Sequence, residues 1–269
     1  MRADAPSQWQ RRDPDLPPRP SEIFERSERE GRERLERSLL GQFSTGFTAG
    51  FNIVFAVVAL GITHHLVSAR YGEELGQLAG AAVFGIGLTF LVIGRSELFT
   101  ENFLDPLSAR ATGIDRFWSR LARLWSLTLL FNLVGGAILT LLLTTEGALP
   151  RGAPDSLVAV AEEIATRDAL ADFTNAIAGG ALVTLLTWLV LAVDTGIARF
   201  AVTWAVGFFL ALGPFNHVVV TVIHLFFGLR YGADFGYGEI GLIGLIATLG
   251  NLVGGVVFVT LLRAVQARA

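Results

Sequence analysis

Two short polar stretches interrupt apolar segments of this sequence. An apolar run that ends at Gly94 leads directly into Arg95, Glu97 and Glu101, and a second apolar run contains His217. Charged side chains inside a hydrocarbon layer cost about 3 kcal/mol on insertion scales and usually mark a pathway. The chemistry that these residues suggest is a polar pathway through the membrane, with a histidine that can exchange a proton near neutral pH.

The composition indicates a membrane protein. Of the 269 residues, 52% are hydrophobic and 17% are charged, whereas a soluble domain carries about 25% charged residues. The formal net charge of −3 gives no global basicity that would favour nucleic acid as a partner. The absence of cysteine excludes disulfides, thiolate catalysis and thiolate metal ligands. We therefore expect the lipid bilayer to be the main partner of this chain.

Charge is concentrated before residue 40. Residues 1–20 are rich in proline and charge, which predicts a disordered cytoplasmic tail. Residues 21–40 repeat a glutamate followed four positions later by an arginine, as in Glu30 and Arg34. This order stabilises an isolated helix, so we expect a charged, solvated cytoplasmic helix there. Residues 41–264 form the predicted transmembrane domain.

Six apolar segments are long enough to cross a bilayer, for which about 20 residues are needed. They are residues 43–66, 78–109, 117–144, 172–193, 197–229 and 239–263, of which the second and the fifth are interrupted. A polar connection over 145–171 separates the first three from the last three. The sequence therefore predicts an all-α membrane protein with six transmembrane helices.

The two halves of the domain repeat. FNLVGGAIL at 131–139 and GNLVGGVVF at 250–258 are near copies with an offset of 119, and the same offset places Glu97 on Asn216. Each half, about 41–144 and 172–264, contains three spans. Because three is an odd number, the second half enters the membrane from the opposite side. We expect an inverted 3+3 repeat with broken helices 2 and 5, which meet near the middle of the membrane.

Arginine counts predict the orientation. If the N-terminus is cytoplasmic, sixteen arginines fall on that side, and only Arg70, Arg151, Arg167 and Arg230 fall in the outer connections. Positively charged connections stay in the cytoplasm. We expect both termini to be cytoplasmic in a multi-pass protein.

Three motifs in these segments resemble the formate/nitrite transporter family. The first interruption reads SELFTEN at 96–102, the second contains FNH at 215–217, and the last span contains GNLVGG at 250–255. The resemblance covers about residues 38–263. It implies a homopentamer of aquaporin-like protomers in the bacterial inner membrane, each with its own pore. Members of the family move small monovalent anions or their conjugate weak acids.

The resemblance also implies a set of pore residues. His217 would be the central histidine and Thr100 the hydroxyl that faces it. Asn216, Asn251, Arg95 and Glu97 would contact the pore or the substrate. The two apolar constrictions would be formed by Phe84, Leu88, Leu98, Phe99, Val183 and Leu210. Asn216 stands where better-known members carry glutamate, and Thr221 stands where asparagine is common, so substrate identity and gating stay open.

The free energy needed to move a bare anion from water into an apolar neck is large, whereas that needed for its conjugate acid is much smaller. We expect the anion to gain a proton near His217 and Thr100 and to cross as the acid, while Arg95 concentrates anions at one mouth. Whether the histidine transfers the proton or only polarises the path stays open. The amides of Asn132 and Asn251 either face the pore or hold neighbouring helices together.

Two other classes of protein fit the sequence less well. A channel for neutral solutes would be expected to carry paired Asn-Pro-Ala elements, which this sequence lacks. An intramembrane metalloenzyme would need ligands among His64, His65, His217 and His224, whose spacing matches no metal-binding helix motif. We therefore expect no enzymatic activity, no cofactor and no metal site.

Overall fold

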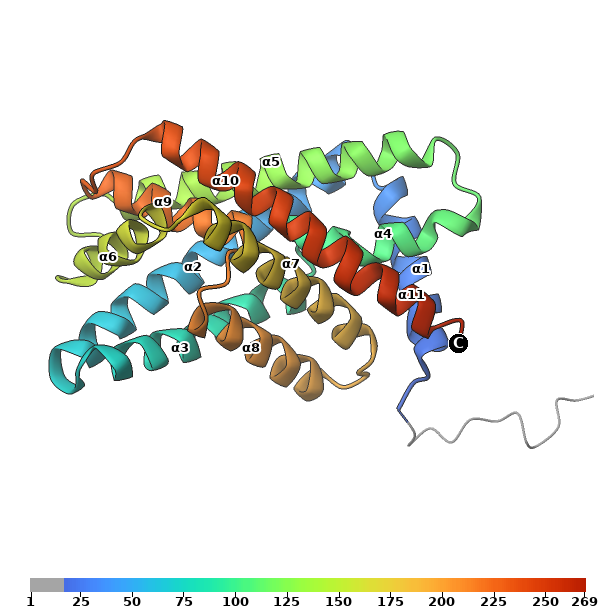
Figure 1. Cartoon of the computed structure of the whole chain (residues 1–269), viewed down its shortest axis with the longest axis horizontal. Helices are drawn as coiled ribbons and strands as arrows, with labels where there is room; N and C mark the ends of the chain where they lie inside the picture. The colour runs from blue at the N-terminus through green and yellow to red at the C-terminus, as the bar shows by residue number, and fades with distance from the viewer. Residues whose placement is uncertain (1–16) are drawn as a thin grey trace, which may run out of the picture.

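The computed structural model describes residues 17–269, which form helices joined by loops, with no strand in that range. Figure 1 shows the helices packed as a bundle, with the C-terminal helices, drawn in red, running obliquely across it. The predicted disordered tail over 1–20 lies, except for its last four residues, outside the described residues.

The long helices follow the predicted spans. The segments long and apolar enough to cross a membrane are α2 (Leu39–Tyr71), α3 (Glu73–Ile93), α5 (Phe117–Leu143), α7 (Ala169–Leu191) and Tyr237–Gln266. The last of these contains α10 (Tyr237–Leu252), a π-helical stretch over Val253–Leu261 and α11 (Leu262–Gln266). The all-helical membrane class expected from the sequence is confirmed.

Shorter elements occupy the predicted interruptions and connections. A 3-10 turn (Phe99–Asn102), α4 (Leu104–Ser108) and a second 3-10 turn (Ala109–Thr112) follow α3. The fifth apolar segment contains α8 (Gly196–Leu212) and α9 (Val218–Arg230), and the polar connection contains α6 (Ala153–Ala165).

Local sequence explains where several helices begin. The side chains of Ser38, Asp168 and Thr195 accept hydrogen bonds from backbone amides in the first turns of α2, α7 and α8, as N-cap residues do. Gly72 separates α2 from α3 with φ of 93°, a conformation that other residues rarely adopt. The chain can therefore reverse with a single residue between two long helices.

The N-terminal helix α1 (Pro20–Glu36) lies at the same end of the bundle as α4, α11 and the C-terminus (Figure 1). The turn between α2 and α3, together with α6, lies at the opposite end. Below, these are called the α1 end and the α6 end.

The expectation of a solvated helix over 21–40 is wrong for one face of α1. Ile23, Phe24 and Leu35 are buried. A Cβ at Gly31 would lie 1.9 Å from the carbonyl oxygen of Asp105, so α1 packs directly on α4. The i,i+4 charge pattern does not reveal that Arg34 and the apolar residues of the other face are buried against the rest of the protein.

Glycines allow the long helices to approach closely. A Cβ at Gly254 would lie 1.9 Å from the carbonyl oxygen of Ile177 in α7. By contrast, a Cβ at Gly241 would meet no atom within 4 Å. The two positions lie in the same C-terminal span, so they form a matched pair.

We expect Gly254→Ala to destabilise the protein by about 1–3 kcal/mol, because the backbone of α7 must move to make room. Gly241→Ala should be neutral or slightly stabilising, because alanine favours the helix. Thermal unfolding of the two variants in detergent tests this difference. Equal melting temperatures would contradict the close packing of α7 against the last span.

Candidate functional site

The two predicted interruptions are loops that meet in the interior. Residues 94–98 follow α3, and residues 213–217 join α8 to α9. Thr100 Oγ1 lies 2.7 Å from His217 Nε2, although the two residues are far apart in sequence. Both side chains are fully buried. The structure thus brings together the predicted histidine and the predicted hydroxyl.

His217 is held at the N-terminus of α9. It is the N-cap residue of that helix, with an extended backbone. Its Nδ1 atom is buried and has no hydrogen-bond partner. On the other side of the contact, Thr184 of α7 donates its hydroxyl to the carbonyl oxygen of Thr100. The ring is therefore positioned through Nε2 and leaves one nitrogen unpaired.

Two asparagines hold the loops in place. Asn132 of α5 accepts a hydrogen bond from the amide of Phe99 at 2.8 Å and donates to the carbonyl oxygens of Gly46 and Glu97. Both donors and the acceptor of the Asn132 side chain are therefore engaged by backbone groups, as expected for a residue that joins helices.

Asn251 of α10 makes the corresponding contacts with the second loop. Its Oδ1 atom accepts from the amide of Val218 at 2.9 Å, and its Nδ2 atom donates to the carbonyl oxygens of Ala176 and Asn216. Both donors and the acceptor of Asn251 are therefore engaged. Of the two roles left open for these amides, this geometry favours holding the loop.

The residues predicted to form constrictions belong to the apolar cluster that also contains Val218, next to His217. All six are almost completely buried and belong to one apolar cluster. They are Phe84, Leu88, Leu98, Phe99, Val183 and Leu210. The buried Thr100 and His217 therefore lie in an apolar environment, where an unpaired polar group is costly.

Two cavities flank this apolar cluster. The cavity at the α6 end has a volume of about 310 Å³ and reaches Phe84 and Leu210. The cavity at the α1 end has a volume of about 180 Å³ and reaches Val92. Phe84, Leu88 and Val92 follow one another at intervals of four residues, so they share one face of α3. This face leads from one cavity, past the apolar cluster, to the other over about 12 Å.

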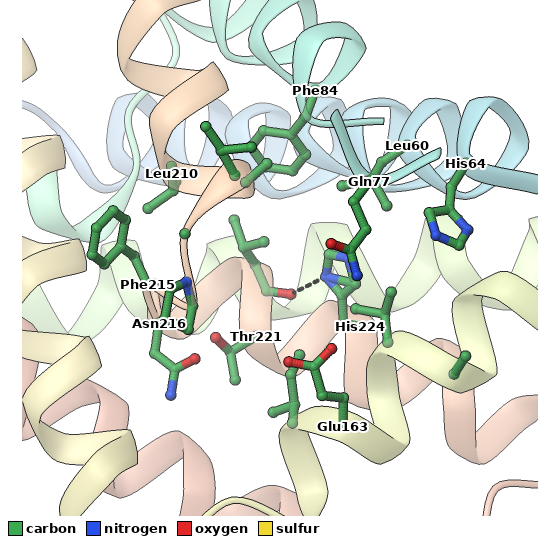
Figure 2. A pocket seen from close by; sticks show the side chains of 18 of the residues that line it. Leu60, His64, Gln77, Phe84, Glu163, Leu210, Phe215, Asn216, Thr221 and His224 are labelled. Atoms are coloured by element: carbon green, nitrogen blue, oxygen red, sulfur yellow. Dashed lines mark hydrogen bonds between the residues drawn. The ribbon is translucent and has the colours of Figure 1, made fainter. Parts of the chain in front are cut away.

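The cavity at the α6 end has polar walls (Figure 2). Asn216 donates from Nδ2 to Asp172 Oδ1 at 2.9 Å, and its Oδ1 accepts from Arg167 at 3.2 Å. Arg167 also forms an ion pair with Glu163 at 2.7 Å. Asn216 is thus a polar wall residue of this cavity whose amide is already engaged.

The cavity at the α1 end is charged. Arg95 is exposed there, whereas Glu97 is buried and pairs with Arg37 at 2.8 Å and Arg34 at 3.4 Å. Arg34 also pairs with Asp105 at 3.1 Å. Burial alone would lower the pKa of Arg34, but the carboxylates of Glu97 and Asp105 outweigh this effect and hold its pKa above the ordinary value.

Two groups of polar residues at these cavities do not follow from the sequence pattern. The spacing of Arg34 from Glu30 suggests a pair on a helix surface, yet Arg34 reaches the loop after α3 instead. The sequence singles out His224 only among possible metal ligands, and Arg167 only among the arginines of the outer connections. The i,i+7 spacing of the two histidines was the one available signal for His224.

This chain is similar to proteins that are described as transporters. A family model described as formate/nitrite transporter matches residues 21–265. The chain is 33% identical over 224 residues to the nitrite transporter NirC of Salmonella typhimurium, covering 80% of this chain and 81% of that protein. It is 32% identical over 254 residues to a probable formate transporter of Methanothermobacter thermautotrophicus, covering 86% and 90% of the two chains.

Solved structures share the fold. A channel described as an FNT family ion channel superposes with a TM-score of 0.76 at 25% identity, covering 90% of this chain and 96% of that one. A pentameric formate channel with formate bound gives a TM-score of 0.73 at 21% identity, covering 85% and 97%. The family match over nearly all of the described chain, with its helices and its paired loops, shows that this protein belongs to the formate/nitrite transporter family.

Proposed function

We propose that this protein conducts small monovalent anions of weak acids, or the acids themselves, across the bacterial inner membrane. The observation that carries this proposal is the buried contact between Thr100 and His217, which lies inside an apolar cluster between two cavities. Relatives described as nitrite and formate transporters make formate and nitrite the first substrates to test. Location in the inner membrane is supported by a relative described as the inner membrane protein YfdC of Escherichia coli, which is 26% identical over 94% of this chain.

The pair of Thr100 and His217 lies where passage of the solute costs the most free energy in our proposal. A bare anion in the apolar neck would lose its hydration without an equivalent replacement, whereas the conjugate acid can cross at much lower cost. In our proposal the anion gains a proton in the region of His217 and Thr100 and passes the constriction as the acid. The unpaired Nδ1 of His217 is the atom that supports a direct role of the ring.

The two halves of the domain form an inverted repeat with six spans in this proposal, and the broken helices supply the two loops. Support comes from the asparagine contacts. Asn132 and Asn251 are 119 residues apart. Each accepts a hydrogen bond from one backbone amide and donates one to a carbonyl oxygen of its loop, and the partners of the two asparagines are also 119 residues apart. Phe99 corresponds to Val218, and Glu97 corresponds to Asn216. Such matched interruptions are typical of transporters with a site near the midplane.

We place the α1 end in the cytoplasm, so that both termini are cytoplasmic and the α6 end faces the periplasm. Exposed Arg95 then raises the local concentration of anions at the cytoplasmic mouth. Glu97, Asn216 and Asn251 act by positioning the loops, because their side chains are engaged by other protein groups. A homopentamer is proposed from the likeness to the pentameric formate channel.

Weak-acid flux into liposomes that contain an internal pH dye tests this function. We expect protein-dependent uptake of formate or nitrite, and we expect His217→Ala to reduce it about 100-fold, the lower end of the contribution of a positioned acid–base group. His65→Ala is the matched control, because His65 lies next to Gly152, near α6 and away from the two loops.

Uptake that is unchanged by His217→Ala would contradict the role of the histidine while leaving the conducted solute established. No uptake of formate, nitrite, acetate, lactate or hydrosulfide by the folded protein would contradict the proposed function as a whole.

A further inference from the structure

A third cavity lies at the α1 end of the bundle, where α5 begins (Figure 1). It is an open notch of about 440 Å³ between the first turns of α5 and the junction of α1 with α2. Four of its seven lining residues are arginines, namely Arg37, Arg116, Arg120 and Arg123. The proposed pathway past Thr100 and His217 does not use this notch.

Three arginines of the notch keep an uncompensated charge. Arg116, Arg120 and Arg123 form no ion pair within residues 17–269. Arg123 donates from Nη2 to the carbonyl oxygen of Arg37 at 3.4 Å, which orients its guanidinium group without neutralising it. Arg116 and Arg123 are exposed and Arg120 is half-buried, so a ligand can reach all three from outside the protein.

The carboxylates near the notch do not cancel these three charges. Glu36, which lines the notch, pairs with Arg32 at 3.6 Å. Arg37 is likewise paired, with Glu97 at 2.8 Å. When both pairs are counted as neutral and the exposed carboxylate of Asp115 is subtracted from the three arginines, two positive charges remain. The notch therefore favours an anion.

The notch lies where α2 and α5 leave the apolar layer. α5 contains no charged residue after Arg123, and α2 contains no acidic residue or arginine until its last turn. Exposed apolar side chains begin next to the notch, at Leu39, Leu40 and Phe43 of α2. The ring of Phe43 packs against that of Phe131 in α5, with centroids 5.2 Å apart, so the apolar surface continues across both helices.

Trp118 supports this depth. It follows Arg116 by two residues, is 59% exposed, and has the guanidinium group of Arg110 at 4.9 Å from its ring centroid. Exposed tryptophan is enriched where the hydrocarbon meets the lipid headgroups, and arginine near a helix end reaches the same region. The positive notch and the phosphates of the lipids are therefore at the same level.

We propose that this notch binds the phosphate group of an anionic phospholipid, with Arg116, Arg120 and Arg123 around the phosphate and the acyl chains along Leu40 and Phe43. Guanidinium groups form strong, charge-assisted hydrogen bonds with phosphate. Clusters of basic residues beside membrane helices attract anionic headgroups in general. A zwitterionic lipid adds a cationic group, which the two uncompensated positive charges disfavour. This site does not depend on which solute the protein conducts.

Native mass spectrometry of the full-length protein, released from detergent, tests this site. Dioleoylphosphatidylglycerol is titrated into delipidated protein, with dioleoylphosphatidylcholine as the control, because the two lipids share their acyl chains and differ in net charge. The spectra report both the bound lipids and the oligomeric mass. A basic residue near an anionic lipid surface contributes about fivefold to affinity. With two uncompensated charges, we expect phosphatidylglycerol to bind about 25-fold more tightly than phosphatidylcholine.

Glutamine variants locate the bound lipid. Arg116→Gln, Arg120→Gln and Arg123→Gln should each weaken phosphatidylglycerol binding about fivefold, and together about 100-fold. The single variants keep the test valid if the triple variant folds poorly. The matched control removes the same charge from exposed arginines at the α6 end and should leave the affinity unchanged. It combines Arg70→Gln, Arg151→Gln and Arg230→Gln.

Three results would overturn the site. Equal affinity for the two lipids, or equal weakening by the two triple variants, would show only a general attraction between charges. Displacement of phosphatidylglycerol by an equal concentration of glycerol 3-phosphate would show that the acyl chains contribute nothing and that a soluble phosphate is the ligand. A smaller oligomeric mass for the notch variant alone would identify the notch as a contact between copies of this chain. Flux measurements remain independent of all three results.

Discussion

We expect Arg34→Met to lower the stability of the folded protein by about 3–5 kcal/mol, the cost of removing one partner from a buried ion pair. The guanidinium group of Arg34 pairs with Glu97 and Asp105 and donates to the carbonyl oxygen of Glu101 at 2.8 Å. Methionine fills most of the same volume but leaves these groups without their shared partner. Thermal unfolding of the purified protein in detergent measures the loss.

Arg29→Met is the matched control for this prediction, because Arg29 lies on the exposed face of the same helix. Its effect should lie within about 0.5 kcal/mol of zero. Adding Glu97→Gln and Asp105→Asn to Arg34→Met should recover part of the lost stability, because the uncompensated negative charge is then removed. Equal melting temperatures for the two single variants would contradict a buried role for Arg34.

The second large effect is expected for Asn251→Leu. Leucine has a similar size, but it leaves the amide of Val218 and the carbonyl oxygens of Ala176 and Asn216 without their partner. Each buried group that loses its hydrogen bond costs about 1–3 kcal/mol, so the total loss should be at least about 3 kcal/mol. Flux should also fall, because the same side chain positions the loop that carries His217.

Asn251→Asp provides a graded comparison, since aspartate keeps the acceptor for Val218 but loses both donors. Thr248→Val is the control on the same helix, because the Thr248 hydroxyl only returns to Gly244 within α10. We expect Thr248→Val to have a thermal stability close to that of the unmodified protein, and Asn251→Asp and Asn251→Leu to be clearly less stable, since a carboxylate at this buried position faces two carbonyl oxygens. A tolerated leucine with normal flux would show that Asn251 does not hold the loop.

The sequence alone determined the class of the protein and the positions of its apolar helices. Crossing a bilayer requires a continuous apolar segment of fixed length, and this requirement is local, so it can be read directly from residues such as 117–144. The polar motifs around Thr100 and His217 also stand out locally, because polar residues are rare in such segments. The spacing of Phe84 and Leu88 already placed them on one helix face.

Only the tertiary structure decided which residues meet. Glu97 was predicted as a pore residue, but its partners Arg34 and Arg37 come from a helix whose regular charge spacing suggested a solvated surface. The cavity around His224 likewise depends on how α6 and α9 pack. Spacing along one helix specifies a face but not the neighbour that covers it, because contacts between distant segments depend on the packing of the whole chain.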